Sequence, residues 1–211
     1  MMFRLISYIG ILSVAACTCP RENQRLQTGD LLFQCGTGAM TEAIAEATGR
    51  GETLKFTHVG IAIIGNRADS ILEATSDGGV RMTALTDFLA KSARIDGRPA
   101  VVAKRLKDTT GIAAAVRKAR TRIGAPYDYS FLPDNGRYYC SELVYESYLR
   151  PDGTHCFTAR PMNFRAPDGT MPHYWTELFE RLDEPIPEGV AGTNPNDMSR
   201  EANLEEIHRW F

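Results

Sequence analysis

Hydrophobic and polar positions alternate most clearly along the segment Thr57–Ile64. Successive side chains of a strand point to opposite faces, so this alternation predicts a strand with a buried face. Gly65 and Asn66 follow it and can form a two-residue turn. The segment Ser70–Ala74 then has the composition of a second strand. Together the two segments predict an antiparallel hairpin.

The length of the hairpin loop decides which side chains meet across the two strands. If Gly65 and Asn66 alone form the loop, His58 lies directly opposite Glu73, with Cβ atoms about 4.5–5.5 Å apart. That separation allows an imidazole and a carboxylate to share a hydrogen bond. A four-residue loop makes the two residues diagonal neighbours on one face, and a three-residue loop places them on opposite faces.

The remaining pattern mixes helices and strands. Strands are expected at 29–34, 80–82 and 100–105, and helices at 41–48, 83–89, 110–124, 140–150, 173–182 and 201–211. Thr83, and Thr109 or Thr110, are the expected N-caps of two of these helices. We therefore expect an α+β fold in which an antiparallel sheet packs against the helix that carries Cys140.

Composition sets two further limits. The chain has 211 residues, which fits one domain, and its formal net charge of −2 gives no indication of a nucleic-acid partner. It has five cysteines, at positions 17, 19, 35, 140 and 156, and no pair has the C-x-x-C spacing of a metal site. Cys35 and Cys156 could form a disulfide or remain free.

The first 17 residues have the pattern of a targeting segment. Arg4 provides a positive charge, and the apolar run 5–16 is too short to span a bilayer. The run ends in Val14-Ala15-Ala16-Cys17, which resembles a bacterial lipobox. This resemblance implies cleavage before Cys17 and attachment of lipid to that residue; the alternative is a plain secretory signal.

The expected organisation is therefore a signal peptide at 1–16, a polar tether at 17–28 and a single domain at 29–211. The domain would lie outside the cytoplasm, held to a membrane through Cys17. Thr18 follows the lipidated cysteine, which in a Gram-negative source implies the periplasmic side of the outer membrane.

Cys140 is the first candidate for chemistry. It stands at the start of an amphipathic helix, after a cluster of turn-forming residues at 132–136. A thiol at a helix N-terminus feels the positive end of the helix dipole and free backbone N–H groups, and both favour the nucleophilic thiolate. The alternative is a structural cysteine on a core-facing helix.

A cysteine hydrolase needs a thiolate, a base that carries its proton and a group that orients the base. Cys140, His58 and Glu73 could fill these roles. Four motifs occur in a consistent order: Gly29-Asp30-Leu31-Leu32-Phe33, Thr57-His58-Val59-Gly60-Ile61, Glu73-Ala74 and Tyr139-Cys140-Ser141-Glu142-Leu143-Val144. The array resembles the circularly permuted NlpC-type cysteine peptidases of the YiiX/YaeF-like group, which have papain-like folds related to lecithin retinol acyltransferase.

The resemblance covers about residues 26–200. It implies a permuted papain-like fold with Cys140 as nucleophile, His58 as base and Glu73 as orienting group. Tyr127 and Tyr139 are the candidate substrate-binding residues. It also implies an enzyme of the cysteine peptidase/amidase type, which acts on a cell-wall peptide or another small amide without a cofactor.

Each candidate has an alternative role. His58 could be a core histidine bonded to a carbonyl, and Asp77 or a backbone carbonyl could orient the imidazole in place of Glu73. Tyr127 could simply pack, and Asp30 is expected to stabilise a turn. Adjacent His155 and Cys156 make a poor chelate, so no metal site is expected. Ser141 lacks the G-x-S-x-G setting of a nucleophilic serine.

Two other functions are consistent with the same residues. One is a lipid acyl hydrolase or acyltransferase that uses the same thioester chemistry. The other is a module that binds a lipid or peptide without turning it over.

Overall fold

The computed structural model describes residues 25–211. The predicted signal peptide and the lipidation site at Cys17 lie outside these residues. No helix among residues 25–211 has the length and apolar character needed to cross a bilayer.

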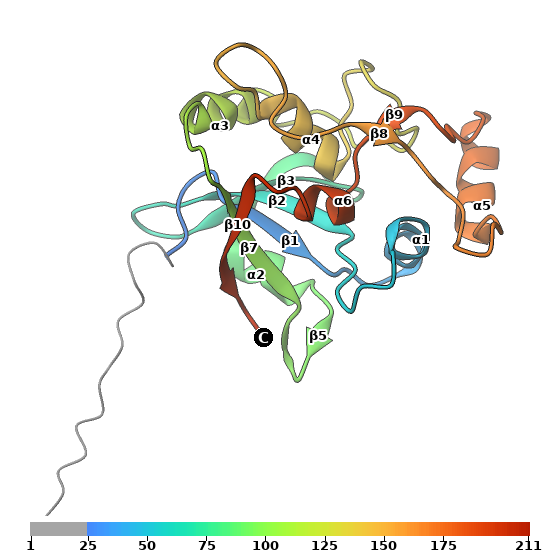
Figure 1. The fold of residues 1–211 in the computed structure, drawn as a ribbon, viewed down its shortest axis with the longest axis horizontal. Coiled ribbons are helices and arrows are strands. Elements are labelled where there is room, and N and C mark those ends of the chain that lie inside the picture. The colour runs from blue at the N-terminus through green and yellow to red at the C-terminus, as the bar shows by residue number, and fades with distance from the viewer. Residues whose placement is uncertain (1–24) are drawn as a thin grey trace, which may run out of the picture.

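A six-stranded antiparallel sheet forms the centre of the fold (Figure 1). Its strands, in spatial order, are β10 (Leu204–Arg209), β7 (Val101–Leu106), β1 (Leu31–Gln34), β2 (His58–Ile63), β3 (Ser70–Thr75) and β4 (Gly79–Ala84). Two short ribbons lie outside it, β5 (Arg94–Ile95) with β6 (Arg98–Pro99) and β8 (Arg160–Pro161) with β9 (Ala191–Gly192). The expected α+β fold is confirmed.

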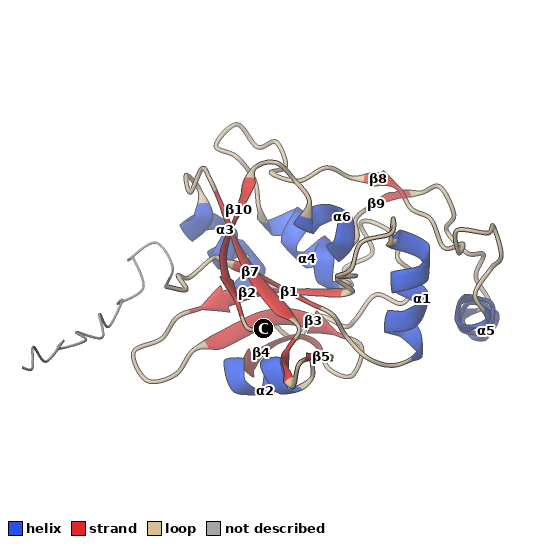
Figure 2. Ribbon diagram, turned by 60° about the horizontal axis from the view of Figure 1, so that its bottom comes forward, coloured by secondary structure: helices blue, strands red, loops and turns tan. Residues whose placement is uncertain are grey.

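The described residues also form six helices: α1 (Ala39–Thr48), α2 (Leu85–Ala90), α3 (Ile112–Arg120), α4 (Cys140–Ser147), α5 (His173–Leu182) and α6 (Pro195–Ser199). Figure 2 shows α3 and α4 on one face of the sheet and α2 on the other. The expected helices at 41–48 and 173–182 are present, and the helix of Cys140 begins at the expected residue.

The larger part of the core lies between α4 and the sheet. Leu143 and Val144 of α4 are buried in the same cluster as Val59 and Ile61 of β2. Because side chains alternate along β2, Ala62 faces the other way and packs with Phe88 of α2 in a smaller cluster. Both faces of the sheet are therefore covered, and the position of α4 is fixed by apolar packing.

The segment 201–211 contains the strand β10 (Leu204–Arg209) and no helix, so the predicted closing helix is wrong. Leu204 and Ile207 are buried at a spacing of three, which is the helical period. The backbone nevertheless pairs with β7, and the register shifts between Glu206 and His208. Such a bulge adds a residue to one strand and disrupts the alternation by which strands are identified in a sequence.

The two predicted threonine N-caps are also wrong. Thr83 lies within β4, and α2 is preceded by Ala84. The N-cap of α3 is Gly111, whose φ of 90° lies in the left-handed region that favours glycine. That helix ends near Arg120, before the predicted end at 124.

A buried ion pair fixes the beginning of β1. Arg105 Nε lies 2.7 Å from Asp30 Oδ1, and Arg105 Nη2 lies 2.9 Å from Asp30 Oδ2. The backbone N–H of Gln27 also donates to Asp30. Asp30 therefore has a structural role in the turn before β1, as expected.

We expect Asp30→Asn to lower the free energy of unfolding by about 3–5 kcal/mol, because it removes the carboxylate charge from a buried ion pair with the Arg105 guanidinium. Glu206→Gln is the matched control, since its pair with Arg209 is exposed to solvent and contributes about 1 kcal/mol or less. Urea denaturation of both variants measures the difference. Equal losses would contradict the structural role of Asp30.

Candidate active site

Cys140 is the first residue of α4, and its side chain is buried. The preceding loop includes Phe131, Asp134 and Gly136 with positive φ angles, which turn the chain into the helix. Glu142 stands in the first turn and accepts a hydrogen bond from the Tyr139 N–H at 3.3 Å. A carboxyl group at this position caps the helix. The thiol is thus held at the start of a rigid helix.

His58 is the first residue of β2, and the structure brings it together with Cys140 and Glu73. Its Nε2 lies 2.6 Å from Glu73 Oε2, so the other ring nitrogen is left for the thiol. Burial alone would lower the pKa of His58. Hydrogen bonds to Cys140 and to Glu73 have the opposite effect and raise that pKa to about 10. An imidazolium beside the thiol is therefore favoured at neutral pH.

Glu73 is buried, with only 2% of its surface exposed. Burial would raise the pKa of this carboxyl, but the hydrogen bonds from His58 and Thr83 and the charge of Arg81 lower it below its usual range. The group is therefore ionised at neutral pH. A buried carboxylate with such partners stabilises a neighbouring imidazolium.

The hairpin register explains how His58 and Glu73 meet. Ile63 pairs with Ser70 and Ile61 with Leu72, so the two residues are diagonal neighbours, as expected for a four-residue loop. The simplest alternative, a two-residue loop at Gly65 and Asn66, is wrong. Diagonal neighbours are farther apart than directly opposed residues, but long side chains bridge that distance.

Gly60 provides the space that this diagonal contact needs. Continued along the strands, the register places Gly60 opposite Glu73. A Cβ atom at Gly60 would lie 2.3 Å from Ile71 Cγ2 and 3.4 Å from Glu73 Cβ. The ring of Phe88 packs near His58, with its centroid 5.7 Å from that of the imidazole. The absent side chain at Gly60 thus lets the carboxylate lean toward His58.

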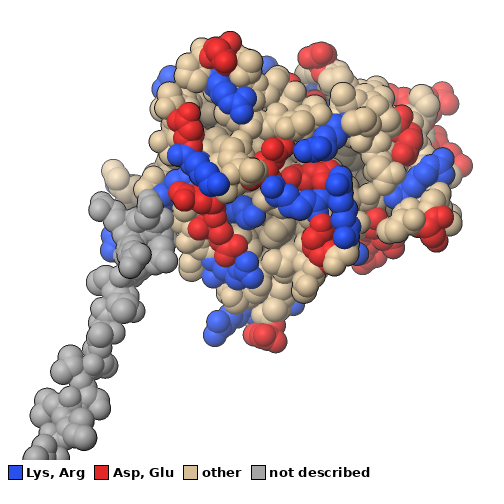
Figure 3. Space-filling model, in the orientation of Figure 1, with Lys and Arg blue, Asp and Glu red and all other residues tan. Residues whose placement is uncertain are grey.

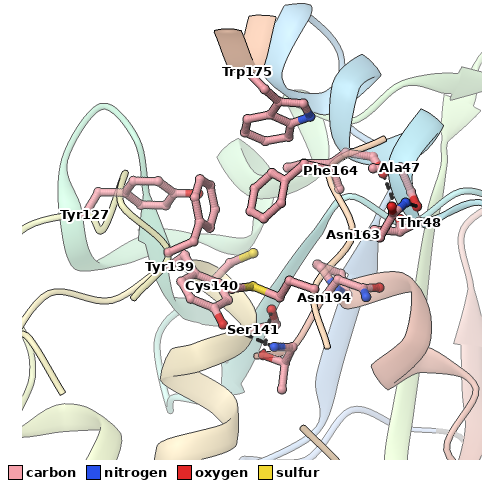
Figure 4. Close-up of a pocket in the computed structure, with 15 residues that line it drawn as sticks. Ala47, Thr48, Tyr127, Tyr139, Cys140, Ser141, Asn163, Phe164, Trp175 and Asn194 are labelled. Carbon is pink, nitrogen blue, oxygen red and sulfur yellow. Dashed lines mark hydrogen bonds between the residues drawn. The ribbon is translucent and has the colours of Figure 1, made fainter. Parts of the chain in front are cut away.

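Two cavities meet at Cys140. The first, which we call the polar cleft, has a volume of about 240 Å³ and is lined by Gln34, Thr57, His58, Glu73, Asp77 and Lys91 among others. The second, which we call the apolar pocket, has a volume of about 50 Å³ and includes Phe131, Met162, Phe164 and Trp175 in its walls. Figure 4 shows the second cavity, with Trp175 and Phe164 on one side and Ser141 and Asn194 on the other.

The two predicted substrate-binding tyrosines both line the apolar pocket (Figure 4). Tyr127 also lines the polar cleft, so it stands between the two cavities beside Cys140. Its hydroxyl lies 3.8 Å from the sulfur of Met40, which is a weak acceptor. The hydroxyl of Tyr139 accepts a hydrogen bond from the Thr193 N–H at 3.1 Å. Tyr139 therefore also has a structural role.

The alternative residues have other partners. Asp77 pairs with Arg81 and Lys91, while His58 bonds to Glu73. His155 stacks on Tyr145, and its Nδ1 lies 2.9 Å from the carbonyl oxygen of Tyr145. The hydroxyl of Ser141 is bonded to that of Thr193. Cys35 and Cys156 are free thiols.

Thr83 belongs to this site and was missed in the sequence. Its hydroxyl donates to Glu73 Oε1 at 2.6 Å. The residue lies where β4 ends and α2 begins, so its hydroxyl was assigned to capping. The alternation of Arg81 and Thr83 along β4 is the signal that could have placed it on the face of Glu73.

Two further buried carboxyl groups are those of Asp128 and of Glu142, which lies in the first turn of α4. Asp128 Oδ1 accepts hydrogen bonds from the N–H and hydroxyl of Ser130, while its Oδ2 has no partner among residues 25–211. Burial, and then the charge of Asp128, raise the pKa of Glu142 to about 8. Glu142 is therefore largely protonated at neutral pH.

We expect Glu142→Gln to stabilise the protein relative to the parent at high pH. A carboxyl whose pKa is raised on folding favours the native state at low pH, and this contribution is lost as pH rises from about 4.5 to about 8. Glutamine has no such charge and retains the oxygen that accepts from Tyr139.

The difference in the free energy of unfolding should be small at pH 4 and reach a few kcal/mol at pH 9, in order of magnitude. Thermal unfolding at a series of pH values measures it. A difference between variant and parent that is independent of pH would contradict the assignment.

The comparisons with known proteins agree with this geometry. Residues 25–208 match the model of the Peptidase_C92 family, the permuted papain-like amidases of the YaeF/YiiX type. The chain is 29% identical over 164 residues to the uncharacterized protein YiiX of Escherichia coli strain K12, which covers 76% of this chain and 75% of that protein. It also resembles the crystal structure of YiiX from E. coli O157:H7, with a TM-score of 0.70 and 25% identity over 88% of this chain and 98% of that one.

The protein in that crystal structure is described as a metalloprotein. Within residues 25–211 of the present chain, no three His, Cys, Asp or Glu side chains form a group that could hold a metal ion. The described residues therefore do not fit a metal centre of that kind, and no step of the chemistry below depends on one.

The family match covers most of the chain and agrees with its fold. The chain therefore belongs to the permuted papain-like amidases of the YaeF/YiiX type, a family of cysteine hydrolases.

Proposed function

We propose that this protein cleaves an amide bond through a thioester on Cys140, with His58 as acid and base and Glu73 as its orienting group. The 2.6 Å contact between His58 Nε2 and Glu73 Oε2, on an imidazole that lines the polar cleft together with Cys140, is the observation that carries the proposal. This is the arrangement of nucleophile, base and orienting group that such chemistry requires.

The reaction follows from these positions. The Cys140 thiolate attacks the carbonyl carbon, and the oxyanion forms near the first-turn N–H groups of α4, which lack acceptors within the helix. The His58 imidazolium gives its proton to the leaving nitrogen, the C–N bond breaks, and an amine departs. Water then attacks the thioester carbonyl and gives a proton to His58. The C–S bond breaks, the carboxylic acid is released, and the Cys140 thiolate and the His58 imidazolium are restored.

The position of His58 determines which part of the substrate lies in which cavity. The leaving nitrogen must lie within reach of His58 to receive its proton, so the amine part belongs in the polar cleft. The acyl part then belongs on the other side of Cys140, in the apolar pocket. The substrate that fits both is an amide with a small apolar acyl group and a polar amine, as in a short peptide.

The size of the apolar pocket bears on the second candidate function, a lipid acyl hydrolase or acyltransferase. Its aromatic walls favour an acyl chain, which supports a lipid acyl hydrolase or acyltransferase with the same thioester. Its volume of about 50 Å³ favours a small acyl group instead. A module that binds a lipid or peptide without turnover would use the same two cavities.

The location of the reaction is proposed from sequence alone. Val14-Ala15-Ala16-Cys17 supports export and lipid attachment at Cys17. A domain held there would meet peptides of the cell wall, which are also the substrates that the family resemblance implies. We therefore place cell-wall peptides first among the substrates to test.

The first experiment is the pH dependence of iodoacetamide alkylation, read for each cysteine by mass spectrometry, on a soluble form that begins at Pro20. Burial raises the pKa of the Cys35 and Cys156 thiols, so these two residues are internal controls. At pH 6 we expect Cys140 to react at least about tenfold faster than either control. His58→Ala should remove this advantage.

A Cys140 that reacts no faster than Cys35 and Cys156 would overturn the proposal.

A measurement of turnover distinguishes an enzyme from a module that only binds its ligand. Cys140→Ala should abolish hydrolysis of short peptide amides and leave the unfolding temperature nearly unchanged. A variant that processes its ligand as well as the parent would show that the thioester does not form.

A further inference from the structure

The Glu73 carboxylate is held from both neighbouring strands. On one side Oε2 contacts His58 of β2, and on the other Oε1 accepts the Thr83 hydroxyl of β4, both at 2.6 Å. Both oxygens of the carboxylate are therefore in short hydrogen bonds. Thr83 is itself buried, with 9% of its surface exposed.

The strand register makes the Thr83 contact specific. Ile71 pairs with Thr83 and Glu73 pairs with Arg81, so Thr83 is the diagonal neighbour of Glu73 across β4. Arg81, although directly opposite, donates from Nη2 to Asp77. Arg81 thus contributes its charge to the site, and Thr83 contributes the hydrogen bond.

The carboxylate needs such a bond to keep its direction. The last torsion of a glutamate side chain is broad, so one hydrogen bond does not fix the plane of the carboxylate. A second bond to Oε1 fixes that plane and leaves Oε2 aimed at His58. It also satisfies a buried oxygen that would otherwise be desolvated without a partner.

We propose that Thr83 is a positioning residue for the hydrolysis, acting through Glu73 on the His58–Cys140 pair. The inference rests on the proposed catalytic roles of these three residues. Without the hydroxyl, Glu73 stabilises the His58 imidazolium less well, so the His58–Cys140 pair reacts more slowly with an alkylating agent at acidic and neutral pH.

The test measures Cys140 alkylation from pH 4 to pH 8 in the full chain, together with kcat and KM on any peptide amide that the parent cleaves. Thr83→Val removes the hydroxyl and keeps the branched shape. For this variant we expect Cys140 to react about five- to tenfold more slowly at pH 6. The rise of the alkylation rate with pH should move by about one pH unit to higher pH. For hydrolysis, we expect a fall in kcat with little change in KM. Thr83→Ser should restore the parent profile to within about twofold.

Two controls separate positioning from stability. Ile71→Val trims a methyl group from the residue that pairs with Thr83. It should lower the unfolding temperature without moving the alkylation profile. Thr83→Ala removes the hydroxyl without the valine branch, so both hydroxyl-free variants should give the same shift. If Thr83→Val and Thr83→Ser behave alike, or if Ile71→Val moves the profile equally, the positioning role is wrong.

Glu73→Gln, measured in parallel, distinguishes this inference from the proposed function. If Glu73→Gln slows alkylation and Thr83→Val leaves it at the parent rate, only the role of Thr83 is overturned. If Glu73→Gln and His58→Ala both leave alkylation unchanged, the catalytic roles fail, and the role of Thr83 fails with them.

Discussion

A buried carboxylate is the constraint on which the rest of this site depends. Glu73 is removed from water almost completely, and an unpaired charge in such a place would cost far more than the fold could offset. The surrounding strands meet that cost with a hydrogen bond on each side, from His58 on β2 and Thr83 on β4. The charge, in turn, favours an imidazolium on His58. The buried charge of Glu73 thus favours the protonated form of His58, which lies beside Cys140.

The second requirement is a helix whose N-terminus meets the end of the sheet. Leu143 and Val144 fix α4 against β2 through apolar packing, and Tyr148 at the end of the helix donates to the carbonyl of Gly29 at 2.9 Å. These contacts hold Cys140 where the polar cleft and the apolar pocket join. Rigid packing at one end of α4 and tight side-chain bonds at the other give the preorganised geometry that catalysis needs. The face drawn in Figure 3 carries interspersed basic and acidic groups. We look for specificity in the two cavities at Cys140.

Local patterns predicted those parts of the site that are set by local rules. The alternation around His58 and the return at Glu73 were enough to pair the two strands, and the turn cluster before Cys140 located the start of α4. Local sequence does not decide the length of the loop between β2 and β3. Gly65 and Asn66 have the composition of a two-residue turn, but the chain makes a longer loop. Thr83 was misassigned because a threonine before an amphipathic segment is a good cap in isolation. The apolar pocket could not be predicted, since Trp175 and Phe164 reach Cys140 only through tertiary packing.

The two cavities are built from largely separate parts of the chain. The hydrogen-bonded side chains of His58, Glu73 and Thr83 come from adjacent strands, where register fixes their spacing to within a hydrogen bond. The apolar pocket draws Met162, Phe164 and Trp175 from the segment after α4, and this segment pairs with itself through the short ribbon of β8 and β9. On the proposed mechanism, a change in the pocket walls therefore alters which acyl group fits without altering the bonds around Glu73. Ile44, Tyr127 and Cys140 are the points of contact between these two parts, since all three line each cavity. On the proposed mechanism, substrate choice and proton transfer are coupled mainly through these three side chains.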